Sequence, residues 1–366
     1  MPGTGRHLAV HIGGALAAVA AACALPALMA WLLGPHWPVL LLPLGLAPLA
    51  LVVLFVAKVA RWIRAPVPFR IPLTTGQQRG LPFIIMGTRD GFPYPPATGS
   101  GGQSPPSPTR TPRRGFDNPH STFEVVIRVL LDVFLLRPLF RATPTAPRLG
   151  RGLAHGMARW LWLFAAAFHG ALAIVALRHL RMFLQPAPHF VAWLEDFDVA
   201  TEMFLPKVHG TSIILLLALL FLLGRRLALV RVRYISLAAD YFPLFLLLAI
   251  AVTGIVMRHL TRTDVTAVQQ FALGLAAGKL VLPARADFWL LAHVFSVGTL
   301  LVYFPLSKLM HLPGALLSPT LTLANNNREQ RYINARNPQV EVLHYADYEA
   351  AFRDRMIEAG LPVEKE

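Results

Sequence analysis

Six long apolar stretches dominate the pattern of hydrophobic and polar positions along this chain. They cover residues 9–33, 38–60, 155–183, 208–230, 238–260 and 288–312. Several approach the roughly 20 apolar residues that an α-helix needs to cross a bilayer. The pattern therefore predicts an all-α fold, a polytopic membrane helix bundle of about six spans.

The segments outside these spans predict a linker, one amphipathic helix and a soluble tail. Residues 62–115 are rich in Pro, Gly, Ser and Thr, a composition that cannot bury enough apolar surface to order itself. Residues 121–141, STFEVVIRVLLDVFLLRPLFR, have a wide apolar face closed by Pro138. They predict an interfacial helix on the membrane surface, or equally a helix packed on a partner subunit. The polar C-terminal tail predicts a helix near 346–358 that ends at Gly360 and Pro362.

The charge distribution indicates membrane topology and argues against nucleic-acid binding. The net charge is +15, yet only 14% of residues are charged. Arginines crowd the loop after Ala60 and the short segment 225–233, whereas residues 184–207 carry four acidic side chains and one lysine. The positive-inside rule then places the N-terminus, 61–154, 224–237 and the tail from 313 in the cytoplasm. Residues 184–207 and 261–287 face outward, and the chain is expected in the cytoplasmic (inner) membrane.

The N-terminal stretch indicates whether the first span is retained, and the cysteine content excludes several kinds of site. The N-terminus resembles a signal peptide because Arg6 and His7 precede an apolar run, but this run is longer than that of an ordinary signal sequence, which favours an uncleaved span. Cys23 is the only cysteine. The chain alone therefore cannot form a disulfide, an iron–sulfur cluster or a cysteine-based zinc site.

Four histidines inside two apolar stretches are the strongest candidates for chemistry. His169 and His179 lie ten residues apart in one predicted span, and His293 and His311 lie eighteen apart in another. In the topology above these spans are antiparallel, which matches His169 with His311 near the cytoplasm and His179 with His293 near the outside. Ionisable residues are costly in a membrane, and histidine commonly holds haem iron. The arrangement predicts two haem groups, each held between both helices.

The helical geometry of this prediction is imperfect. Along an α-helix ten residues rise about 15 Å and eighteen about 27 Å, while ten residues leave roughly 80° between two side chains. Helix tilt, oblique macrocycles or a break at Pro305 would have to absorb the mismatch. Hydrogen-bonded bundle histidines remain the alternative, as does a pairing of His169 with His155. The small residue Gly298 admits either a close macrocycle or close helix packing.

The histidine spacing resembles that of the gamma, cytochrome b subunits of respiratory nitrate reductases. The stretches DNPHSTFEVVIRVLLDVFLLRPLFR, VYFPLSKLMHLPGALLSPTLTLANNNR and YEAAFRDRMIEAGLPVEKE further resemble the M subunits of the Dsr membrane complex of dissimilatory sulfite reducers and sulfur oxidisers. The resemblance covers roughly residues 115–366. It divides the chain into two N-terminal spans (1–61), the linker (62–115), a nitrate reductase gamma-like di-haem domain (116–312) and a tail that docks a partner (313–366).

The resemblance implies two b-type haems ligated by His169 with His311 and by His179 with His293. It implies a quinone or quinol as substrate, and a cytoplasmic iron–sulfur subunit that acts on DsrC-type thiol/disulfide. Multihaem cytochrome c and further membrane subunits complete the implied complex. A lysine contacts quinone near the outer haem of the nitrate reductase subunit, and Lys207 in FLPKVHG is the candidate here, with His209 beside it.

Other classes remain possible on the sequence alone. The membrane subunit of a related heterodisulfide-reductase-like or nitrate-reductase-like complex would use the same path of electron transfer. A transporter would be expected to show repeats with paired broken helices, and no such symmetry is visible. A metalloprotease motif of the His-Glu-x-x-His type does not occur. A cofactor-free membrane scaffold is the remaining alternative, and the colour of the purified protein separates it from an electron-transfer subunit.

Overall fold

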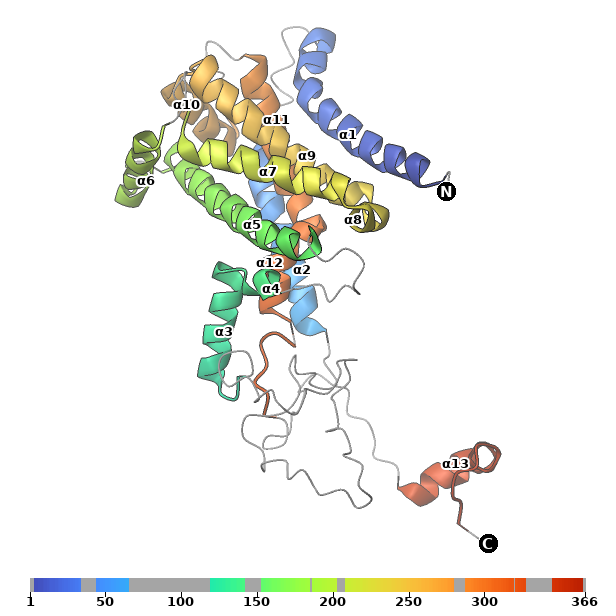
Figure 1. Ribbon diagram of the computed structural model, residues 1–366. Coiled ribbons are helices and arrows are strands. Elements are labelled where there is room, and N and C mark those ends of the chain that lie inside the picture. The colour runs from blue at the N-terminus through green and yellow to red at the C-terminus, as the bar shows by residue number, and fades with distance from the viewer. Residues whose placement is uncertain are drawn as a thin grey trace.

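The computed structural model describes residues 3–33, 44–65, 119–141, 153–184, 186–202, 208–279, 287–318, 320–326 and 344–364, and this part of the chain is helical without a β-strand (Figure 1). The longer helices are α1 (Gly3–Leu33), α2 (Ala47–Arg64), α3 (Thr122–Phe134), α5 (Leu153–Arg178), α6 (His189–Ala200), α7 (Gly210–Ala228), α9 (Ala238–Ile255), α10 (Val265–Ala276), α11 (Phe288–Leu306) and α13 (Tyr345–Glu358). Short helices connect them: α4 (Arg137–Arg141), η2 (His179–Met182), α8 (Val230–Ile235), η3 (Val256–Leu260), η4 (Lys308–Met310) and α12 (His311–Leu316).

Six of these helical segments are long and apolar enough to cross a membrane, which confirms the prediction of about six spans. They are Ala9–Met29, Leu44–Arg64, Arg159–Met182, Gly210–Ala228, Ala238–Leu260 and Phe288–Leu306. Only 6% of the α2 segment is buried inside the bundle, although its mean hydropathy is 2.0. Such an apolar exterior suits lipid and would be costly in water. The chain is a multi-pass membrane protein.

Helix α11 is the centre of the bundle, with α1, α2 and α9 packed around it (Figure 1). A second layer forms where α5 runs beside α7 and α7 packs on α9. Leu215 and Leu219 of α7 are buried there against Ala171 of α5 and Ala251 of α9. Small residues at these contacts let the helix backbones approach closely, as is usual in membranes.

The predicted last span is shorter than its apolar run, because the helix breaks before its end. Helix α11 stops at Leu306, directly after Pro305, and the chain passes through Ser307 into η4 and α12. Proline lacks the backbone N–H that a continuing helix needs. His293 and His311 therefore do not share one continuous helix, as an eighteen-residue helical repeat assumes. The break is the feature that absorbs the spacing mismatch.

The amphipathic segment also ends earlier than the sequence predicts. Helix α3 is opened by a capping box between Ser121 and Glu124 and stops at Phe134. Leu136 has a left-handed backbone with φ of 47°, and the next helix, α4, contains Pro138 in its first turn. Arg128 is 4% exposed, and its guanidinium donates to the carbonyls of Leu321 and Leu323. One face of α3 thus holds the segment that follows the last span.

The predicted C-terminal helix is confirmed as α13, and Gly360 ends it with a left-handed φ of 68°. Most of the Pro-rich linker lies outside the described residues, as does 327–343 of the tail.

Candidate functional site

The structure brings His169 and His311 together, as the antiparallel pairing predicts. His169 lies in the middle of α5, and His311 is the first residue of α12, beyond the break that ends α11. The two imidazole ring centroids are 5.9 Å apart, and the ring planes are nearly perpendicular, at 82°.

The structure also brings His179 and His293 together, toward the other end of the same bundle. His179 opens the 3-10 turn η2 that follows α5, whereas His293 lies inside α11. The ring centroids are 6.4 Å apart, with only 17° between the ring planes. The change from α-helix to 3-10 turn at residue 179 alters the direction of that side chain. A simple helical projection from His169 therefore does not describe it.

All four histidines are oriented through one ring nitrogen. A carbonyl oxygen only accepts, so a contact to Nδ1 fixes the proton on Nδ1 and leaves the lone pair on Nε2. The carbonyl partners of Nδ1 are Ala165 for His169 (2.7 Å), Val175 for His179 (2.7 Å), Ile250 for His293 (3.1 Å) and Lys308 for His311 (3.3 Å). Metal-ligating histidines are typically held in this way.

His293 has a second anchor that sequence reasoning missed. The Thr253 hydroxyl of α9 lies 3.0 Å from its Nδ1, and that hydroxyl itself donates to the carbonyl of Ala249 at 2.7 Å. Next to it, a Cβ on Gly254 would lie 3.2 Å from His293 Cε1, tighter than ordinary contact. A polar threonine followed by glycine in an otherwise apolar span is the sequence signal that could have revealed this contact.

The donor set fits a haem at each pair. Two imidazoles that share one metal have ring centroids about 6 Å apart, because each metal–nitrogen bond is about 2.0–2.1 Å. Both observed separations are close to this value. Within the described ranges no cluster of three or more His, Cys, Asp or Glu side chains could hold a bare metal ion. A haem would need only two side-chain ligands from the chain, and each histidine pair offers two.

Gly298 has a packing role in this structure. A Cβ at that position would lie 2.6 Å from Leu44 Cδ2, so the space beside Gly298 is filled by the residue that opens the second span. Of the two explanations that the sequence left open, close helix packing is the one that this contact supports.

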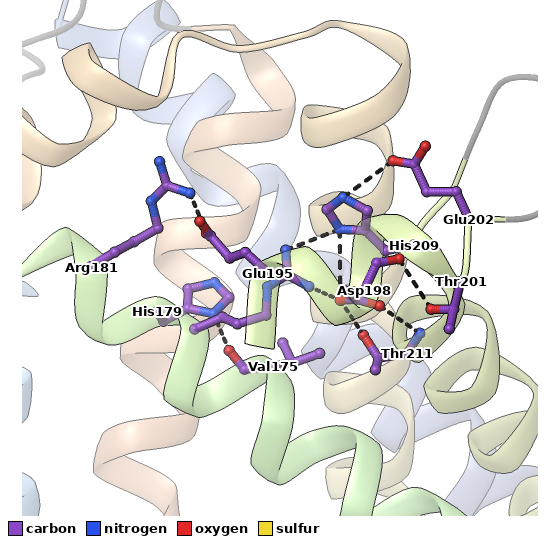
Figure 2. A network of polar contacts seen from close by, with 10 residues as sticks. Val175, His179, Arg181, Glu195, Asp198, Thr201, Glu202, His209 and Thr211 are labelled. Carbon is purple, nitrogen blue, oxygen red and sulfur yellow. Dashed lines mark hydrogen bonds and ion pairs between the residues drawn. The ribbon is translucent and has the colours of Figure 1, made fainter. Parts of the chain in front are cut away.

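A buried ionic network lies beside His179 (Figure 2). Its centre is Asp198 of α6, whose side chain is 0% exposed. The carboxylate accepts from the Arg178 guanidinium, from the Thr211 backbone N–H at 3.0 Å and from the Thr211 hydroxyl at 2.6 Å. Arg178 immediately precedes His179 in the chain. The network therefore joins α5, α6 and α7 directly next to His179.

His209 belongs to the same network. Its Nδ1 accepts from Arg178 at 2.9 Å, and its Nε2 lies 3.5 Å from a Glu202 carboxylate oxygen. Burial, followed by the positive charge of Arg178, lowers the pKa of His209 below its ordinary value. Its ring also meets His259 edge-on, with 4.7 Å between centroids. His209 is thus a buried, neutral partner of Arg178, while Lys207, the other predicted quinone contact, lies outside the described residues.

A cavity of about 260 Å³ is lined by residues of η2, α6 and α10 and of the segment between η2 and α6. Arg181, two residues after His179, forms an ion pair with Glu195 at the wall of this cavity. The side-chain amide of Gln269 donates to the Arg181 carbonyl at 2.7 Å. The lining residues are Arg181, Leu184, Ala187, Val191, Ala192, Glu195 and Gln269. The walls combine apolar side chains with a few polar groups, and the volume is below the roughly 300–1,000 Å³ of pockets that enclose drug-sized ligands.

Comparison with known proteins gives consistent matches. The family described as nitrate reductase gamma subunit matches residues 156–325, a range that contains all four histidines. The Hdr-like menaquinol oxidoreductase cytochrome b-like subunits of Archaeoglobus fulgidus and Archaeoglobus profundus are each 35% identical to the chain. The alignments cover 77% and 78% of this chain, respectively, and 78% of each relative. No solved structure matches the chain.

Proposed function

The chain belongs to the nitrate reductase gamma-like family, together with the Hdr-like menaquinol oxidoreductase cytochrome b-like subunits, and we propose that it is a di-haem b electron-transfer subunit. In this proposal it carries electrons between the quinone pool and a cytoplasmic iron–sulfur subunit. The observation that carries the proposal is the pairing of His169 with His311 and of His179 with His293.

The four histidines have one task, which is to hold two irons in the membrane. A haem held by two of these histidines would supply one-electron transfer. The carbonyl contacts at Nδ1 keep each ring in one tautomer with Nε2 free for iron. Rigid ligands need little rearrangement when the iron changes its charge, and this suits electron transfer.

We propose that quinol reacts at the end of the bundle near the His179–His293 pair. The name of the relatives, menaquinol oxidoreductase, supports quinol as the substrate class. Oxidation of a quinol releases two protons with its two electrons, so acceptors are needed beside the head group. Glu195 lines the cavity at this end of the bundle, and a Glu202 carboxylate oxygen lies close to His209. Lys207, five residues after Glu202, is the proposed contact to a quinone oxygen.

The proposed topology puts the quinol end outside and the His169–His311 end toward the cytoplasm. The arginine-rich segment 225–233 supports this orientation in the cytoplasmic membrane. The tail from 313 then faces the proposed iron–sulfur subunit, which would act on DsrC-type thiol/disulfide. Other membrane and multihaem cytochrome c subunits complete the proposed complex. With Cys23 alone, this chain leaves dithiol chemistry to such a partner.

Quinol-driven haem reduction tests the proposal. We expect the purified complex to be reduced by a naphthoquinol, and the Lys207→Ala variant to be reduced at least tenfold more slowly with both haems retained. Loss of a charged contact of about 1.5–3 kcal/mol accounts for this factor. Lys279→Ala is the matched control, because this exposed lysine lies on the same proposed side. A colourless protein would indicate a scaffold, and equal rates in both variants would remove Lys207 from the site.

A further inference from the structure

The segment that carries His311 begins at the C-terminal end of α11. Helix α11 stops at Leu306, and the last carbonyls of a helix have no partner within it. These groups carry partial negative charge and are stabilised by a cation or a donor from elsewhere. The chain then runs through η4 to His311 and on to Gly314. What holds this helix end therefore influences where the His311 ring points.

Lys58 of α2 supplies the missing donor. Its ammonium donates to the carbonyl of Pro305 at 2.7 Å and lies 3.5 Å from the carbonyl of Ser307. The same ammonium lies 5.5 Å from the centroid of the Trp62 ring, within cation–π range. Lysine near a helix C-terminus is a common stabilising arrangement, but here it comes from a different helix, 247 residues away in the chain.

Trp62, one turn further along α2, lies beside the other end of the segment. Two atoms of its indole ring lie 3.8 Å from the position that a Cβ on Gly314 would occupy. Lys58 therefore contacts the chain before His311, and Trp62 lies next to the chain after it. A third contact joins the middle of the segment to α9, where Lys308 donates to Asp240 at 2.7 Å. The Lys308 carbonyl in turn holds His311 Nδ1.

The two N-terminal spans lie outside the region that matches the nitrate reductase gamma family, residues 156–325. They are nevertheless packed on α11 along its length. Cys23 of α1 contacts Ser296 at 3.5 Å, and Leu44 fills the space beside Gly298. Lys58 and Trp62 continue this contact to the end of α11.

We propose that α2 is a brace for the His169–His311 site, with Lys58 as the residue that positions His311 and tunes its iron. This inference rests on the proposed function. The cation at Lys58 favours the reduced iron, which carries less positive charge, and so raises the midpoint potential of that haem. A lysine that only anchors the span by reaching toward the membrane surface would have no such effect.

The test is a redox titration of the full-length protein with Lys58→Met. We expect the potential of one haem to fall, with the equilibrium constant for its reduction lowered about tenfold, or about 59 mV for a one-electron couple. The haem that shifts should be the one absent from His311→Ala. Lys58→Arg should restore the wild-type potential. Arg61→Met is the matched control, since it removes an exposed cation three residues away on the same helix.

Each outcome has a defined meaning. Two haems with wild-type potentials in Lys58→Met would overturn the brace and leave the proposed function intact, whereas absence of haem from the wild type would overturn both. A shift of the other haem, or an equal shift in Arg61→Met, would also overturn the brace. If Lys58→Met does not accumulate, Trp62→Leu replaces it. This variant should change the electron paramagnetic resonance signal of the His169–His311 haem alone, and an unchanged signal would refute the inference.

Discussion

Replacement of Asp198 by asparagine should destabilise the protein far more than the matching change at Glu195. Both carboxylates lie on α6 and both pair with an arginine at the end of α5 or in η2, but they differ in burial. The Asp198 side chain is 0% exposed and that of Arg178 is 15% exposed. The side chains of Glu195 and Arg181 are 27% and 33% exposed. The two pairs thus compare a buried and a partly solvated ion pair within one region.

The expected magnitudes follow from this burial. Removing one partner of a buried pair costs about 3–5 kcal/mol, because the remaining charge is left without compensation. Asparagine retains one oxygen for the Thr211 N–H, so we expect a loss of about 3 kcal/mol for Asp198→Asn. A solvated pair contributes about 0–1 kcal/mol, which is the loss expected for Glu195→Gln.

The assay is unfolding of the purified protein in mixed detergent micelles, followed by circular dichroism and by the haem absorbance. Asp198→Asn should lower the free energy of unfolding by at least 2 kcal/mol more than Glu195→Gln. The haem at His179 should be released first, since Arg178 precedes that ligand. Equal losses in the two variants would show that the Asp198 network does not hold α5, α6 and α7 together.

Further predictions concern the second histidine pair and the pH dependence. Thr253→Val removes one of two acceptors at His293 Nδ1 and should raise the potential of that haem alone in a redox titration, because the ligand becomes a weaker base. Gly254→Ala should alter the electron paramagnetic resonance signal of the same haem, since the new Cβ lies 3.2 Å from the ring. Burial and Arg178 lower the pKa of His209 below 6.5. Its contribution to the free energy of unfolding is therefore complete above 6.5 and falls below it, because the unfolded chain binds the proton first. Unfolding measured on both sides of this pH should show a steeper acid loss in wild type than in His209→Gln, and parallel curves would contradict the assignment.

The features that the sequence predicts well depend on local patterns. Span positions follow from the length of each apolar run, and the histidine pairs follow from depth matching in antiparallel spans. Neither inference requires knowledge of side-chain packing. The C-terminal helix was likewise marked by Gly360, which has the left-handed backbone expected at a helix end.

The features that the sequence does not reveal depend on contacts between distant segments. In the sequence Arg128 interrupts an apolar face. In the structure it is buried, and its guanidinium donates to the carbonyls of Leu321 and Leu323. Lys58 reads as a lysine near a span end, and its carbonyl partners appear only once α2 and α11 are placed side by side. The sequence also does not reveal that Arg178 donates to Nδ1 of His209, the residue predicted beside the quinone contact Lys207.

Haem stoichiometry tests the central claim most directly. Pyridine haemochrome analysis of the purified chain should give two protohaems, and replacement of any one of the four paired histidines by alanine should remove one of them. His189→Ala is the control, because His189 is exposed at the start of α6, and it should retain both. Variants of His169 and His311 should lose the same haem, and variants of His179 and His293 the other. A wild-type protein without haem, or paired-histidine variants that keep both haems, would contradict the account.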